Sequence, residues 1–240
     1  MVHSLLGRLC LEEGALDEAF RHFEAIAPVK PMTLFEIHAS IYVWYPMCEF
    51  ARGNASRALE MLANARQIAF DDNLPHLDIL AAAQEVQILV ATGRLAEAEE
   101  LARSTQLEHV LGIAGEPGAL PVDVAEAVIG ACFGLALAQG RLPAAARIAD
   151  DALAGALRAG RPLVEIGARL LAARAALARA DAAAARAAVE QALRVAAACG
   201  AVQAFIWAGA EVLAIVRAIA TTARHDAAAW AADVVAIADE

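Results

Sequence analysis

The chain has 240 residues, of which 60% are hydrophobic and only 5% are aromatic, and much of the hydrophobic share is alanine. Alanine is the best helix former and adds little volume, so this composition favours many closely packed helices. The 19 basic residues are outweighed by 29 acidic residues, giving a net charge of −10 at pH 7, and no basic run could follow a phosphate backbone. We therefore expect no direct binding to nucleic acid by this segment.

The N-terminal segment has no basic leader followed by an apolar block, as a signal peptide would have. The most apolar stretch, 205–220, is interrupted by Glu211 and Arg217 and is too short to cross a bilayer. Four cysteines lie far apart, without the close spacing of a zinc site: Cys10, Cys48, Cys132 and Cys199. These features predict a cytoplasmic protein with free thiols and no membrane partner.

A pattern of a small residue at a turn, followed five positions later by alanine, occurs five times in the chain. The pairs are Gly14 and Ala19, Gly53 and Ala58, Gly93 and Ala98, Gly140 and Ala145, and Ala180 and Ala185. The turns are about 40 residues apart, a spacing typical of helix-pair repeats, with a longer interval before Gly140. Glycine accepts the left-handed conformation that ends a helix, and a small alanine lets the next helix cross closely.

These turns, together with the prolines, divide the chain into expected helices. The ranges are 33–52, 55–72, 76–92, 95–110, 121–139, 142–159, 163–179, 182–198 and 202–222. We predict an all-α fold, a right-handed TPR-like α-solenoid with a period near 40 residues, as one domain over 1–240. Residues 1–31 would form a partial first repeat, 32–200 four helix pairs, and 201–240 the C-terminal capping helices. Pro46 lies inside the expected helix 33–52, where a kink or a break is expected because proline has no backbone N–H.

The second half of the chain carries its turns in a particular order. It has Ala-Gln-Gly-Arg at 138–141, Ala-Gly-Arg at 159–161, Ala180-Asp181, Ala192-Leu193 with Ala196, and Gly200 followed by Phe205. In order and spacing, this region resembles the C-terminal repeats of the MalT-like TPR domain of large ATP-dependent LuxR-family transcriptional regulators. Residues before about 130 resemble that domain only as generic repeats. Acidic residues usual in the family after the last phenylalanine are replaced here by 206–209, Ile-Trp-Ala-Gly.

The resemblance implies an effector-sensing segment, which in the family lies between a nucleotide-binding switch module and a helix-turn-helix. Neither a Gly-x4-Gly-Lys-Ser/Thr motif nor a DNA-recognition helix pair occurs in the 240 residues. We therefore expect either an excised segment of such a regulator or a stand-alone derivative.

No group of residues in the sequence has the arrangement of a catalytic or metal site. The six histidines are dispersed, none forms His-Glu-x-x-His, and none lies near a cysteine at the spacing typical of metal ligands. Paired carboxylates such as Asp71-Asp72 and Asp150-Asp151 fall among other charges, as on a solvated helix face. We expect a protein that is not an enzyme and needs no metal or other cofactor.

The first helix of each pair in a solenoid lines the concave side, so residues nine and six before each turn are expected to point inward. The candidate ligand-binding residues on this basis are Trp44, Met47, Gln84, Gln87 and Arg174. An aromatic platform beside amides and a cation is a usual makeup for a site that takes a small organic molecule. Alternatively, Trp44 belongs to the core between repeats, the glutamines are plainly exposed, and Arg174 pairs with a neighbouring acid.

The preferred function is recognition of an effector, either a small-molecule inducer or a regulatory protein, in the concave groove, with self-association also possible. The alternative is a stand-alone TPR scaffold that mediates protein–protein interaction by gripping a peptide. A groove rich in Asn, Lys and Arg would favour the scaffold, and this groove has few such residues.

Overall fold

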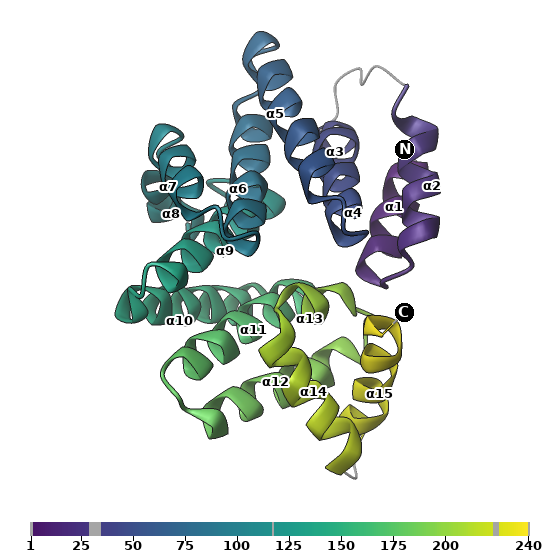
Figure 1. The fold of residues 1–240 in the computed structure, drawn as a ribbon, viewed down its shortest axis with the longest axis vertical. Coiled ribbons are helices and arrows are strands. Elements are labelled where there is room, and N and C mark those ends of the chain that lie inside the picture. Colours follow the sequence, from purple (N-terminus) through teal and green to yellow (C-terminus); the bar gives the residue numbers. More distant parts are fainter. Residues whose placement is uncertain (1, 29–34, 117, 223–225, 240) are drawn as a thin grey trace. The chain divides into compact units, whose positions relative to one another are not determined.

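The computed structural model describes residues 2–28, 35–116, 118–222 and 226–239. Every regular element within these ranges is a helix, and the predicted all-α class is confirmed (Figure 1). The contacts divide the chain into two compact units, the first formed by residues up to Leu11 with 15–139 and the second by 12–14 with 140–240. No helix in the described ranges has both the length and the apolar character needed to cross a membrane.

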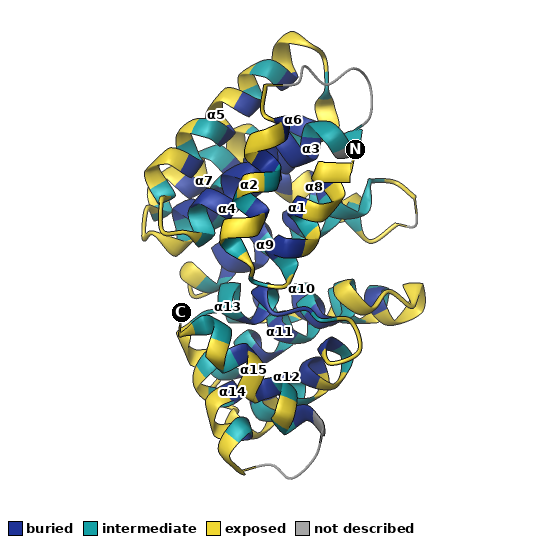
Figure 2. Cartoon of the chain, turned by 90° about the vertical axis from the view of Figure 1, so that its right-hand side faces the viewer, coloured by how far each residue is buried: buried dark blue, intermediate teal, exposed yellow. Residues whose placement is uncertain are grey.

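The first unit contains the helices up to the turn at Gly140. They are α1 (Val2–Glu12), α2 (Leu16–Ile26), α3 (Phe35–Ala39), the π-helical turn η1 (Ser40–Trp44), α4 (Tyr45–Ala51), α5 (Ala55–Asp71), α6 (Pro75–Ala91), α7 (Leu95–Ser104), α8 (Leu107–Ala114) and α9 (Val122–Ala138). The second unit contains α10 (Leu142–Ala159), α11 (Pro162–Ala178), α12 (Ala182–Ala196), α13 (Gln203–Trp207), α14 (Ala210–Thr222) and α15 (Asp226–Ala238). Figure 2 shows that buried residues follow the sides on which helices of each unit face one another.

The five predicted turns have the backbone conformation that the repeat pattern requires. Their φ angles are all positive: 79° at Gly14, 87° at Gly53, 75° at Gly93, 70° at Gly140 and 61° at Ala180. At the second of them the Asn54 N–H donates to the Glu49 carbonyl at 2.9 Å, the bond that closes a Schellman turn. The alanines five positions later are all fully buried, at 0% exposure: Ala19, Ala58, Ala98, Ala145 and Ala185. Each therefore sits where the second helix of a pair packs closely on its neighbours.

The predicted interruption near Pro46 takes the form of a widened turn. Residues Ser40–Trp44 are π-helical, and the Tyr45 N–H donates to the Ser40 carbonyl five residues back. Proline has no N–H to offer to a carbonyl of the preceding turn, and a π turn before it accommodates the missing bond. The helix then resumes as α4, and both η1 and α4 pack on α5.

Two of the expected helices are wrong because each is broken into two. The expected helix 95–110 ends at Ser104, where the Ser104 and Thr105 hydroxyls donate to the Leu101 carbonyl and compete with the helical bonds. Gln106 then takes a left-handed φ of 53° before α8 begins. The expected helix 202–222 is broken at Gly209, where φ is 99°. These turns redirect α8 onto α9 and α14 onto α15.

The core of the second unit is built from α11, α12, α13, α14 and α15 around the fully buried Phe205. The short segment 12–14 joins this unit, because the Val202 N–H donates to the Glu12 carbonyl at 2.9 Å. Gly14 lies so close to α15 that a Cβ atom placed there would be 2.6 Å from Ile237 Cγ2. Gly14 is therefore needed both for its positive φ and for the space it leaves.

Candidate functional site

The predicted aromatic platform is buried, not open. Trp44 lies in η1 with 7% of its surface exposed, and Met47 lies in α4 with 4% exposed. The expectation that both side chains line an open groove is therefore corrected, because the packing of η1 and α4 against the flanking helices covers them. Their part in ligand binding stays a prediction. It requires that the side chain that covers Trp44 can move aside.

The group that lies over Trp44 is the guanidinium of Arg8, from α1. The Arg8 Cζ atom is 4.3 Å from the centre of the Trp44 ring, within cation–π range. The same guanidinium makes a two-pronged ion pair with Asp123, at the start of α9, in which Nη2 donates to Oδ1 at 2.9 Å. The side chains of Arg8 and Asp123 keep 32% and 20% exposure. We call these three residues the Arg8–Trp44–Asp123 cluster.

Sequence reasoning missed Arg8 and Asp123 because the two are 115 positions apart and sit on helices of different repeats. Arg8 lies six residues before Gly14, one of the positions expected to point inward, whereas Asp123 has no such spacing from a turn glycine. The available signal was that both charges fall on first helices, the class of helix that Trp44 also occupies.

The two predicted glutamines are both on α6, and their side chains pack within the protein and do not project into an open groove. Gln84 is buried at 6% exposure. Gln87 donates from Nε2 to the Ala127 carbonyl of α9 at 3.1 Å, and it packs where a Cβ on Gly130 would lie 3.1 Å from its Oε1. Contrary to the expectation of a projecting amide, Gln87 ties α6 to α9 and is matched by a glycine on the facing helix.

Arg174 belongs to the second unit, on α11, whereas the other four candidates belong to the first. Burial lowers the pKa of its guanidinium, and the carboxylate of Glu211 on α14 acts in the opposite direction. The alternative that Arg174 faces a neighbouring acid agrees with this electrostatic contact. Its assignment to a ligand site stays a prediction.

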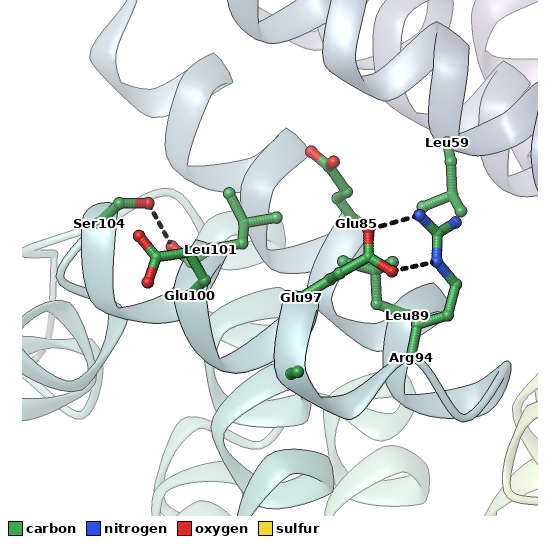
Figure 3. A pocket seen from close by; sticks show the side chains of 9 residues that line it. Leu59, Glu85, Leu89, Arg94, Glu97, Glu100, Leu101 and Ser104 are labelled. Atoms are coloured by element: carbon green, nitrogen blue, oxygen red, sulfur yellow. Dashed lines mark hydrogen bonds and ion pairs between the residues drawn. The ribbon is translucent and has the colours of Figure 1, made fainter.

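A hollow of about 450 Å³ lies among α5, α6 and α7 (Figure 3). Its apolar lining includes Leu59, Leu89 and Leu101, and its polar lining includes Glu85, Arg94, Glu97, Glu100 and Ser104. Arg94 is already paired with Glu97, with Nε 2.7 Å from Oε1 and Nη2 2.6 Å from Oε2. The hollow thus has apolar walls formed by leucines and two further carboxylates, that of Glu85 and that of Glu100, which is itself paired with Arg103.

Glu85 is the most deeply placed acid of this hollow, with 16% of its side chain exposed. Burial raises the pKa of its carboxyl, and Arg66, whose Nη1 is 3.5 Å from Oε2, lowers it. Arg66 is shared, because its Nε also contacts Asp78 Oδ1 at 3.1 Å. A carboxyl in this position is only partly neutralised and suits a cationic or hydrogen-bond-donating group.

A family model of the MalT-like TPR region matches residues 1–222. The chain belongs to the MalT-like TPR family. This confirms the resemblance seen in the second half and extends it over the first unit, where the sequence offered only generic repeats. No curated protein matches the chain. MalT-like TPR regions are repeat domains, which are generally not catalytic, and the helix-pair solenoid predicted from the turns is confirmed.

Proposed function

We propose that this MalT-like TPR domain is the effector-recognition segment of a LuxR-type transcriptional regulator and works as a binding module, not as an enzyme. The effector would bind on the first-helix side of the first unit, at the Arg8–Trp44–Asp123 cluster. The single observation that supports this place is the partly exposed ion pair stacked on a buried tryptophan. The pair joins α1 to α9, two helices that belong to different repeats.

An ion pair of this kind can exchange partners with a ligand. Asp123 occupies the guanidinium fork that would also fit the carboxylate or phosphate of an effector, because Arg presents paired donors to planar oxyanions. The ligand's remaining surface would then stack near the Trp44 ring, next to the residues of η1. Exchange costs little when one carboxylate replaces another, and the freed Asp123 is already partly in solvent.

Exchange also provides the change of state that a sensor needs. While Arg8 is paired with Asp123, α1 is held to α9 by charge. An anionic effector that takes Arg8 removes that tie, so the two helices are free to separate. The population can shift only as far as the effector binds the state without the Arg8–Asp123 pair more tightly than the state with it. In regulated proteins this difference in binding free energy is typically about 1–3 kcal/mol.

A thermal-shift screen of the whole chain against small organic anions, namely carboxylates and sugar phosphates, tests the proposal, with calorimetry on each hit. We expect at least one anion to raise the unfolding temperature. Its affinity for the Arg8→Gln variant should be about tenfold or more weaker than its affinity for the unmodified chain. Asp123→Asn should bind it more tightly, because the competing carboxylate is gone while the side-chain shape is kept.

The matched control is Arg94→Gln, which removes an exposed arginine that also forms an ion pair, with Glu97. Binding should be unchanged in this variant. A screen without a hit, or hits that bind Arg8→Gln and Arg94→Gln alike, would contradict the proposed site. The regulator context is tested separately by the parent gene, in which we expect a P-loop before this segment and a helix-turn-helix after it.

The alternative function, a scaffold that grips a peptide, is favoured by the hollow among α5, α6 and α7. Leucine walls beside Glu85 and Glu100 would suit a peptide that carries an apolar side chain next to a basic one. Fluorescence anisotropy with labelled peptides of this composition separates the two functions. Binding that is lost in Glu85→Gln and kept in Arg8→Gln would favour the scaffold.

A further inference from the structure

The hairpin of α1 and α2 brings together three side chains of the kinds that bind transition metals. Cys10 is on α1, and Glu18 and His22 are on α2, four residues apart and hence on the same face. One ligand atom from each, a sulfur, a carboxylate oxygen and an imidazole nitrogen, lies within 4.8 Å of the other two. Cys10 and His22 do not have the sequence spacing typical of metal ligands, so it is the folding of the hairpin that brings them together.

A fourth side chain orients the histidine of this group. The Nδ1 atom of His22 is 2.9 Å from the Nδ1 atom of His3, and the two ring centres are 5.1 Å apart. With Nδ1 of His22 engaged, its second ring nitrogen is the one available to a metal. Metal-binding histidines almost always have such an outer partner, which fixes the ring and raises its basicity.

We propose that Cys10, Glu18 and His22 form a metal site, with His3 as a positioning residue, and that its metal is Zn²⁺. Zn–S distances near 2.3 Å and Zn–N or Zn–O distances near 2.0–2.2 Å place the ligand atoms of a tetrahedral site roughly 3.3–3.7 Å apart. Side-chain rotations that bring the atoms together by about 1 Å therefore complete the site. The fourth position is left to water or to a ligand.

The choice of metal follows from the donor atoms. A thiolate and an imidazole suit Zn²⁺, whereas Mg²⁺ and Ca²⁺ require oxygen ligands throughout. Binding replaces the thiol proton of Cys10 by the metal and releases that proton to solvent, so Zn²⁺ affinity rises with pH. The ion can reach the site, because Glu18 is exposed and His22 is half-buried, while the sulfur of Cys10 closes the inner side. This proposal does not depend on the proposed effector site.

Titration of the metal-free, full-length chain with Co²⁺ and then Zn²⁺ tests the site. We expect Co²⁺ to produce a thiolate-to-metal charge-transfer absorption that saturates at one equivalent, and we expect Zn²⁺ but not excess Mg²⁺ to abolish it. The absorption should be absent in Cys10→Ser. Affinity should fall by about 10- to 100-fold in His3→Ala, as for loss of an outer-shell partner, and by more in His22→Ala.

Two variants serve as controls, each removing an exposed residue of the same type as a proposed ligand: Cys199→Ser and His109→Ala. Both should titrate as the unmodified chain does. If Cys10→Ser fails to give a helical circular dichroism spectrum, Glu18→Gln replaces it, because that side chain is exposed and its loss leaves the packing intact. A chain without the charge-transfer absorption, an absorption that survives in Cys10→Ser, or a Co²⁺ affinity that is unchanged in Glu18→Gln would overturn the assignment.

Discussion

Replacing Trp44 with alanine separates a core tryptophan from one that lines an open groove. The side chain has 7% exposure, so its truncation removes most of a buried indole and leaves a cavity, which costs roughly 3–5 kcal/mol. Loss of the stacked Arg8 guanidinium adds about 0.5–2 kcal/mol. For a domain of this size, 1 kcal/mol lowers the unfolding temperature by about 2–4 °C, so we expect a loss of at least about 6 °C.

Thermal unfolding followed by circular dichroism at 222 nm, the usual helical band, measures this loss. Phe70→Ala is the matched control, since it truncates an aromatic residue of the same unit that is 81% exposed, and it should change stability by less than about 0.5 kcal/mol. Trp44→Phe should fall between the two. If Trp44→Ala melted within 2 °C of the Phe70→Ala variant, a tolerance set by the scale above, the burial argument would be refuted and the open-groove interpretation would return.

Two further predictions concern packing and charge. In urea unfolding, Gly14→Ala should lower the free energy of unfolding by about 1–3 kcal/mol more than Gly93→Ala does. Both positions need a positive φ, but only at Gly14 would the new Cβ press against Ile237. Equal losses would mean that α15 shifts to make room for the Cβ. Burial raises the folded-state pKa of Glu85, so the folded chain binds more protons between the unfolded and folded pKa values, and stability falls as the pH rises through that window. Glu85→Gln should therefore stabilise the chain at neutral pH, with a gain that disappears below the unfolded pKa; a gain independent of pH would contradict this cause.

The repeat turns could be predicted from sequence because each depends on a local backbone requirement. A positive φ restricts the residue at the turn, and close helix crossing restricts the residue five positions later, so both leave a mark in the chain. Ala180 shows how far this extends, since it occupies a glycine position and still takes a φ of 61°. The same logic failed at Gln106, where two hydroxyls ended the helix and no glycine or proline marked the break.

The candidate site was less predictable because it depends on contacts between distant repeats. Counting back from a turn identifies the helix and its inward side, and Trp44 indeed lies on a helix that packs against α6. What covers that side chain depends on Arg8, 36 positions away in sequence and in another repeat. Counting back six positions from Gly14 marks Arg8 as inward-facing, but the spacing within one repeat does not show which distant side chain it covers.

The two proposals meet on one helix, α1, through residues that lie two positions apart. Arg8 reaches toward Trp44 and Asp123, while Cys10 faces α2. Successive residues of a helix are rotated by about 100° about its axis, so side chains two positions apart point in directions about 200° apart. Arg8 and Cys10 can therefore make their contacts on different sides of α1. A metal that joins Cys10 to α2 would hold α1 against its own hairpin partner when an effector removes the tie between Arg8 and Asp123. If both proposals hold, α2 would move together with α1, and the whole first helix pair would respond to the effector.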